Sequence, residues 1–308
     1  MRDQSSTAIH KLSIALLGLW TALWLGANLL WLQQDRILRD GDEEGHVGAA
    51  ELFREDLRGG QLLSFLERAF VGDMGDYPSL YPAVLGGWWW ASGAGEPGVA
   101  SVRALGLLWV LLAALATARI ATRSGRPGAA SLAFLATTLL PLPVGLARHF
   151  MPEGMLVAAV PLALWAAMRL GERPGLGRSL VLGLALGLGL LIKQTFLLLV
   201  LPGLAFILLA ARPPLRALLP ALLLSAGLAG PWTLAHLAEQ ARYGVDSALA
   251  SGEGAAWAHL LYYPAALALL VCGPVLGLAA LGALPGLRAC RARRLALAWL
   301  LGGLLLLT

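Results

Sequence analysis

The chain has 308 residues, of which 58% are apolar and only 13% are charged, whereas about a quarter of an ordinary soluble domain is charged. A chain this apolar cannot cover its own surface with polar groups, which excludes a soluble enzyme, a disordered chain and a nucleic-acid-binding protein. The formal net charge of +5 is therefore read as a guide to membrane topology, because basic residues collect on the cytoplasmic side.

The first apolar run, residues 9–32, predicts a retained N-terminal anchor, since about 20 apolar residues cross a bilayer. A long polar stretch follows. Within it, residues 41–55 predict a helix, because Val47, Ala50 and Phe53 recur at helical spacing. A short apolar run at 79–92 contains three consecutive tryptophans. Further spans are predicted at residues 99–122, 127–147, 153–170, 179–192, 196–211, 215–237, 259–284 and 295–308.

The basic residues favour one topology. If residues 79–92 lie along the outer interface, the arginine clusters within 119–126, 169–178, 212–216 and 288–294 all fall inside, together with the N-terminus. We therefore expect an all-α polytopic bundle of about nine spans. It forms a single domain over residues 1–308, with a first outer loop at 33–98. The Ala-, Leu- and Arg-rich composition indicates a GC-rich bacterial genome, and hence a plasma membrane with the active face outward.

The acids are concentrated in the first outer loop, where residues 35–76 hold 11 of the chain's 18 Asp and Glu residues. A solvated loop explains most of them. Asp42, Glu43 and His46, however, lie at the start of the predicted helix, where backbone N–H groups are free. A helix cap accounts for one acid but not for the cluster.

Two further groups of ionisable residues lie at membrane boundaries. The short loop at 148–153 holds Arg148, His149 and Glu153, and Lys193 interrupts an apolar run. Simpler interpretations are a snorkelling Arg148 paired with Glu153, and a helix-end anchor at Lys193. In the topology above, both groups and the acid cluster meet at the outer face, which predicts a site for an anionic lipid headgroup.

The order of these motifs resembles a known family. Residues 42–50, DEEGHVGAA, resemble the acidic motif that opens the first outer loop of polytopic glycosyltransferases of the GT-C fold. Residues 77–81, 148–153 and 189–194 resemble the later family segments PPLY, sR…D/E and Gl…tK, and Tyr262-Tyr263-Pro264 fits the general pattern. The nearest groups are the protein O-mannosyltransferases, the lipid A aminoarabinose transferases and the bacterial glycosyltransferase family 39 proteins.

The resemblance implies a membrane glycosyltransferase that moves a sugar from a polyprenyl-phosphate donor to an acceptor at the outer face. The acceptor would be a protein, a lipid or a polysaccharide. Asp42 would be the catalytic base, with Glu43 the second choice. Arg148 and Lys193 would bind the donor phosphate. The supporting residues are His46, Tyr81, His149 and Glu153.

Other readings stay open. Glu153 would either orient Arg148 or join Asp42 in holding a divalent cation, as in some relatives; no other cofactor is expected. Family members usually run longer and carry a C-terminal motif absent here, so the chain is expected to be a fragment, a short member or one subunit of a pair. A lipid or solute transporter, or a non-catalytic subunit or scaffold of an envelope assembly, is the alternative function.

Overall fold

A computed structural model of the chain describes residues 2–34, 41–72, 78–93, 99–126, 128–239 and 242. Every regular element within these residues is helical, as expected for an all-α protein. The helices are α1 (Arg2–Gln34), α2 (Gly41–Arg58), α3 (Leu62–Phe70), α4 (Leu80–Ala91), α5 (Val99–Ala121), α6 (Ala129–Leu139), α7 (Pro141–Ala147), α8 (Pro152–Glu172), α9 (Leu176–Ile192), α10 (Thr195–Ala211) and α11 (Leu215–Ala235).

Four of the described helices are long and apolar enough to cross a membrane. These candidate spans are Ile14–Gln34 in α1, Arg103–Ser124 at α5, Pro152–Glu172 in α8 and Leu215–Ala235 in α11. Helices α6, α9 and α10 are apolar but shorter. The chain is thus a multi-pass membrane protein. The spans predicted at 259–284 and 295–308, and the Tyr262-Tyr263-Pro264 motif, lie outside the described residues.

The span expected at residues 127–147 is not one continuous helix. The chain forms α6 and then α7, with Leu140 between them in an extended conformation (φ −63°, ψ 128°). The cause is Pro141, because the ring of a proline disfavours a helical conformation in the residue before it. The break matters for the site, since α7 carries the chain into the turn at 148–151.

Helices α8 to α11 pack around a shared core in which Leu170, Leu191 and Phe196 are fully buried. Helix α9 lies directly against α11. A Cβ atom at Gly183 would come 2.6 Å from the Ala221 carbonyl oxygen, and one at Gly187 would come 2.9 Å from Leu228. This pair of small residues therefore allows the two helices to approach closely.

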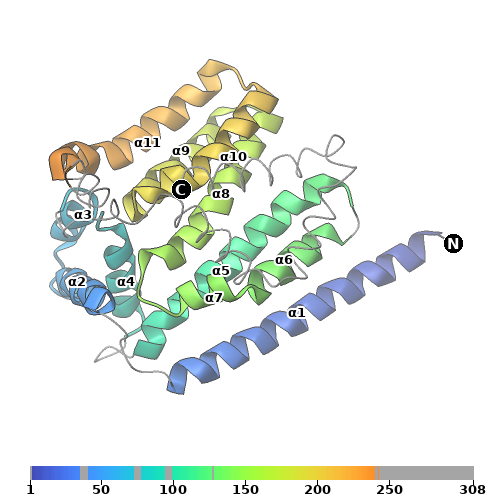
Figure 1. The fold of residues 1–308 in the computed structure, drawn as a ribbon, viewed down its shortest axis with the longest axis horizontal. Helices are drawn as coiled ribbons and strands as arrows, with labels where there is room; N and C mark the ends of the chain where they lie inside the picture. The colour runs from blue at the N-terminus through green and yellow to red at the C-terminus, as the bar shows by residue number, and fades with distance from the viewer. Residues whose placement is uncertain are drawn as a thin grey trace, which may run out of the picture.

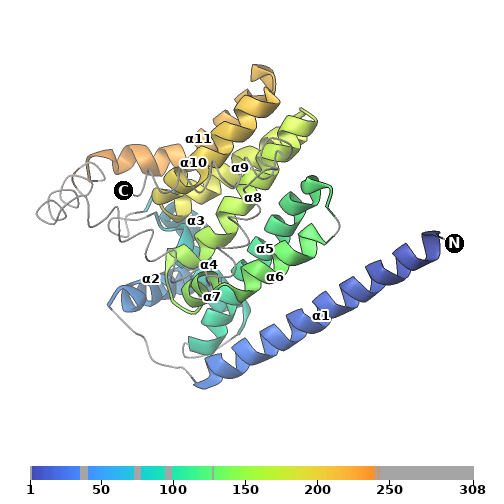
Figure 2. The ribbon, with the colours of Figure 1, turned by 45° about the vertical axis from the view of Figure 1, so that its right-hand side comes forward.

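Helix α1 stands apart from the rest of the bundle, and its N-terminal half diverges from α5 and α6 in both ribbon views (Figures 1 and 2). Tryptophans make part of its contact with the bundle. Trp24 is buried against α5, and the Trp20 indole N–H donates to Thr138 Oγ1 at 3.0 Å. Its C-terminal end lies beside the start of α5.

Helices α2, α3 and α4 form a cap at one end of the bundle (Figure 1). Helix α4 has 12 residues, about 18 Å at the usual rise, which is too short to cross a bilayer. Leu85 and Trp89 bury one of its faces, while Trp88 and Trp90 are exposed. The segment 79–92 therefore packs onto the bundle without spanning it, in agreement with the charge argument.

The arginine clusters within 119–126, 169–178 and 212–216 lie at the other end, and the predicted cluster at 288–294 lies outside the described residues. Arg123 Nε, in the turn after α5, pairs with Glu172 Oε1 at the end of α8 at 2.9 Å. A Cβ at Gly171 would contact Ala211 at the end of α10. Because α9 and α11 begin a few residues later, Arg178 and Arg216 belong to this end too. The turn at 148–151 and Lys193 lie at the cap end, together with the acids of α2. The groups proposed for the site and these arginine clusters are therefore at opposite ends of the bundle, as the sequence predicts.

Candidate functional site

Glu43 is the centre of the candidate site. It lies in the first turn of α2, where acidic side chains interact favourably with the helix N-terminus, and its side chain is completely buried. Arg103 of α5 approaches Glu43 Oε2 to 3.3 Å. His149 Nδ1 lies 3.0 Å from Glu43 Oε1, and the Phe150 backbone N–H donates to the same oxygen at 3.1 Å. One carboxylate thus joins α2, α5 and the turn at 148–151.

The sequence analysis missed Arg103. Its guanidinium is as buried as Glu43 and lies 5.1 Å from the centre of the Phe150 ring. Burying two charges requires that they be paired and hydrogen-bonded, and this geometry meets the requirement. The signal was present in the sequence, because an ionisable residue inside an apolar run is by default a candidate functional residue.

Tyr81 lies beside this cluster in the first turn of α4 and is 4% exposed. Its ring meets the His46 ring edge-on, with the centroids 5.2 Å apart. Burial raises the pKa of the Tyr81 phenol well above its usual value, and the negative charges of Glu153 and then Glu43 add to the shift. The phenol therefore stays protonated through the physiological pH range and can donate a hydrogen bond.

Lys193 and Glu153 form an ion pair between the end of α9 and the first turn of α8. Lys193 ends α9 because its backbone is extended (φ −165°, ψ 141°). The pair uses Glu153 Oε1, while Oε2 is buried without a hydrogen-bond partner among the described residues. The pairing of Glu153 with Arg148, considered from the sequence, is therefore replaced by a pairing with Lys193.

Arg148 points toward α1, away from the Glu43 cluster. Its Nε and Nη2 groups donate to Asn28 Oδ1 at 3.2 and 2.8 Å. Its guanidinium lies 4.0 Å from the centre of the Trp31 ring. Asn28 is itself fixed by donating to the Trp24 carbonyl at 2.8 Å. Neither Asn28 nor Trp31 was singled out from the sequence, because nothing in an anchor helix indicates which face a distant arginine will contact.

Asp42 is exposed at the start of α2. Of the residues proposed from the sequence, the structure brings Glu43, His149, Tyr81 and His46 together at the cap end, and places the Glu153–Lys193 pair near Tyr81. Arg148 adjoins this group through the turn but contacts α1.

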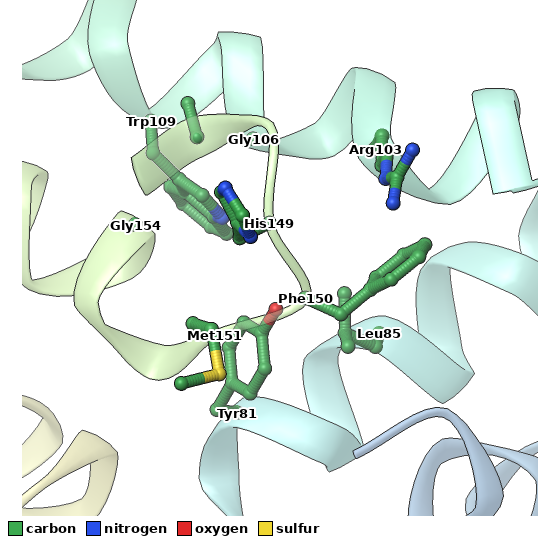
Figure 3. Close-up of a pocket in the computed structure, with 10 residues that line it drawn as sticks. Tyr81, Leu85, Arg103, Gly106, Trp109, His149, Phe150, Met151 and Gly154 are labelled. Carbon is green, nitrogen blue, oxygen red and sulfur yellow. The ribbon is translucent and has the colours of Figure 1, made fainter. Parts of the chain in front are cut away.

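A small hollow lies beside the cluster, between α4, α5 and the turn at 148–151 (Figure 3). Its empty space is about 240 Å3 when the solvent at its mouth is included. Tyr81, Trp109, His149 and Met151 line it, and the Tyr81 hydroxyl points into it on the side facing His149 (Figure 3).

The described residues do not fit a divalent cation. No group of three or more His, Cys, Asp or Glu side chains in that part of the chain is placed to hold a metal ion. Glu153 pairs with Lys193, and Asp42 is exposed. We derive no step through a cation.

Comparison with known proteins indicates the class of protein to which part of the chain is similar. Residues 94–236 match the model of a family described as dolichyl-phosphate-mannose-protein mannosyltransferase. The match runs from just before α5 to the end of α11 and includes Arg103, Arg148, His149 and Lys193. No curated protein and no solved structure matches the chain.

A helical membrane bundle with carboxylates and cations gathered at one end, carrying this family segment, defines a membrane glycosyltransferase of the GT-C type. Residues 94–236 are similar to the dolichyl-phosphate-mannose-protein mannosyltransferase family, which supports the resemblance drawn from the motifs.

Proposed function

We propose that the chain transfers a sugar from a polyprenyl-phosphate donor to an acceptor at the outer face of the plasma membrane. The observation that carries the proposal is the cap-end cluster, in which Glu43 joins the first outer loop to the turn at 148–151. The family name adds support for a lipid-phosphate donor. The arginine clusters at the opposite end support a cytoplasmic N-terminus and an outward-facing site.

The donor phosphate needs fixed positive charge, because negative charge grows on it as the bond to the sugar breaks. We assign this role to Arg148 and Lys193. Arg148 can offer a planar fork to phosphate oxygens, and the contacts with Asn28 and Trp31 hold its guanidinium in place. Lys193 would bring a point charge from α9, with Glu153 keeping it oriented until donor arrives.

The acceptor needs a base to take the proton of its attacking hydroxyl or amine. Asp42 is our first choice, because it is exposed at the start of α2 and can meet an incoming acceptor. Glu43, its neighbour, is fully buried and bonded to Arg103 and His149. We therefore give Glu43 the role of holding the two loops together, with the base role as second choice.

Replacing Asp42 tests the assignment. With Asp42→Asn in nanodiscs, we expect transfer from polyprenyl-phosphate mannose, the first donor of a panel, to fall by about 100-fold or more. Binding of the donor should stay near the wild-type value, since the phosphate contacts are intact. Turnover is measured as release of polyprenyl phosphate.

Glu55→Gln is the matched control, because Glu55 is an exposed acid on the same helix. It should leave both turnover and binding unchanged. Full turnover in Asp42→Asn would remove Asp42 as the base. A wild-type protein that transfers sugar from no donor in the panel would refute the function itself.

A further inference from the structure

The Tyr81 hydroxyl opens onto the hollow, and it is not among the fully buried polar atoms that lack a hydrogen-bond partner. The residue is 4% exposed, and no hydrogen bond joins its hydroxyl to any of the described residues. The hydroxyl instead points into the hollow (Figure 3). Because the hydroxyl opens onto the hollow, it can donate a hydrogen bond to whatever occupies that space, whether a water molecule or an oxygen of a ligand.

The carboxylates nearby do not take this role. Both oxygens of Glu43 are occupied, one by Arg103 and the other by His149 and the Phe150 N–H. Glu153 is near enough to raise the pKa of the phenol; its Oε1 pairs with Lys193, while its Oε2 has no hydrogen-bond partner among the described residues. A tyrosine that served packing alone could be a phenylalanine here, since the edge-on contact with His46 needs only the ring.

The shape of the hollow limits what can enter. Its enclosed part has room for little more than one water molecule, so it can take a single hydroxyl and not a whole sugar ring. Aromatic walls with one or two polar groups are typical of small-ligand sites, and here Trp109 and Phe150 accompany Tyr81 and His149. The turn that forms one wall also carries Arg148, which the proposed function assigns to the donor phosphate.

We propose that the hollow receives one hydroxyl of the donor's sugar, and that Tyr81 donates a hydrogen bond to its oxygen. This inference rests on the proposed function, because it takes the sugar to be attached to the lipid phosphate. Tyr81 is thus a binding residue that distinguishes a sugar-bearing lipid from the bare lipid phosphate.

Fluorine NMR tests the contact directly. The chain has five tyrosines, so the full-length protein in nanodiscs can be labelled with 3-fluorotyrosine, and Tyr81→Phe identifies the Tyr81 signal by its loss. We expect polyprenyl-phosphate mannose to shift this signal and bare polyprenyl phosphate to leave it in place. Equal shifts with the two lipids, or no shift although the sugar lipid binds, would overturn the inference.

Two further outcomes separate this inference from the proposed function. If the Tyr81 signal shifts with the sugar lipid but no acceptor is ever glycosylated, the hollow binds sugar and the transfer reaction is wrong. If methyl α-mannoside alone shifts the signal and the sugar lipid does not, the hollow belongs to an acceptor and the inference is wrong.

Affinity gives a second readout. Tyr81→Phe should weaken binding of polyprenyl-phosphate mannose by about 5- to 10-fold, the usual worth of one neutral hydrogen bond, and should leave bare polyprenyl phosphate unaffected. Tyr243→Phe controls for removal of a phenol elsewhere in the chain. Equal weakening toward both lipids would show that Tyr81 serves only the fold, and would overturn the inference.

Discussion

Asp42 and Glu43 are neighbours in the chain and lie in opposite environments. Asp42 is exposed, whereas Glu43 is buried against three donors from α5 and the turn at 148–151. Their position in the first turn of a helix explains why acids are favoured there. It does not explain why Asp42 is exposed and Glu43 is buried. That difference follows from the direction in which each side chain leaves α2.

Arg103 should be essential for stability. Arg103→Met leaves the buried Glu43 carboxylate without its strongest partner, and breaking a buried ion pair in this way costs about 3–5 kcal/mol. We expect a clear fall in the thermal unfolding temperature of the detergent-solubilised protein. Arg119→Met, on an exposed residue of the same helix, should change it little.

A second substitution checks the cause. Adding Glu43→Gln to Arg103→Met removes the uncompensated charge, so part of the lost stability should return. If Arg103→Met unfolds at the wild-type temperature, the pair does not hold the two loops together.

The sequence predicted the charged groups of the site better than their pairings. The acids at 42–43, the 148–153 motif and Lys193 were all recognisable from their residue types and boundaries. The partners were not, because Asn28 is 120 residues from Arg148 and Arg103 is 60 residues from Glu43. Such contacts depend on how the helices pack, and residue spacing within one segment carries no information about them.

At the scale of helices, the contact between α5 and α7 sets the position of the turn at 148–151. A Cβ atom at Gly106 would lie 1.8 Å from the Ala147 carbonyl oxygen, so only glycine allows the two backbones to approach this closely. Ala147 immediately precedes Arg148 and His149. The separation of α5 from α7 therefore determines where both side chains begin.

Gly106→Ala should disturb the site without altering any charge. The added methyl group must push α7 away, and overpacking of this kind costs about 1–3 kcal/mol or more. We expect a lower unfolding temperature and weaker binding of polyprenyl-phosphate mannose. Gly227→Ala is the control, because a Cβ there meets nothing within 4 Å. A Gly106→Ala protein with wild-type stability and binding would contradict the role given to this contact.

Most helix boundaries followed from hydropathy, and the one break that hydropathy did not indicate has a local cause. The apolar run at 127–147 reads as a single span, yet Pro141 divides it at Leu140. Prolines inside α8, α10 and α11 leave those helices continuous. A proline in a run of apolar residues thus has two outcomes, and tertiary packing decides between them.

For the whole molecule, the main feature is that the acid-rich cap and the arginine-rich turns lie at opposite ends of the bundle. The cap end holds Glu43, Glu153 and Lys193, and the other end holds the paired Arg123 and Glu172. The positive-inside rule predicts that the second end faces the cytoplasm. The orientation of the chain in the membrane therefore decides which side of the membrane the candidate site faces.

Cysteine labelling tests that orientation. After Cys272 and Cys290 are replaced by serine, Glu44→Cys marks the exposed start of α2 and Thr122→Cys marks the turn after α5. The second substitution keeps every arginine. In intact cells an impermeant maleimide should label residue 44, and it should reach residue 122 only after permeabilisation. Labelling of both from one side would contradict the topology.

The turn at 148–151 has a consequence for the N-terminal helix. Two consecutive residues of the turn contact different helices. Arg148 donates hydrogen bonds to Asn28 of α1, and His149 contacts Glu43 of α2. Helix α1 adds little to the shared interior, and much of its surface is left for lipid. Through Arg148, helix α1 is thus tied to the turn that also carries His149, and so to the candidate site of the proposed function.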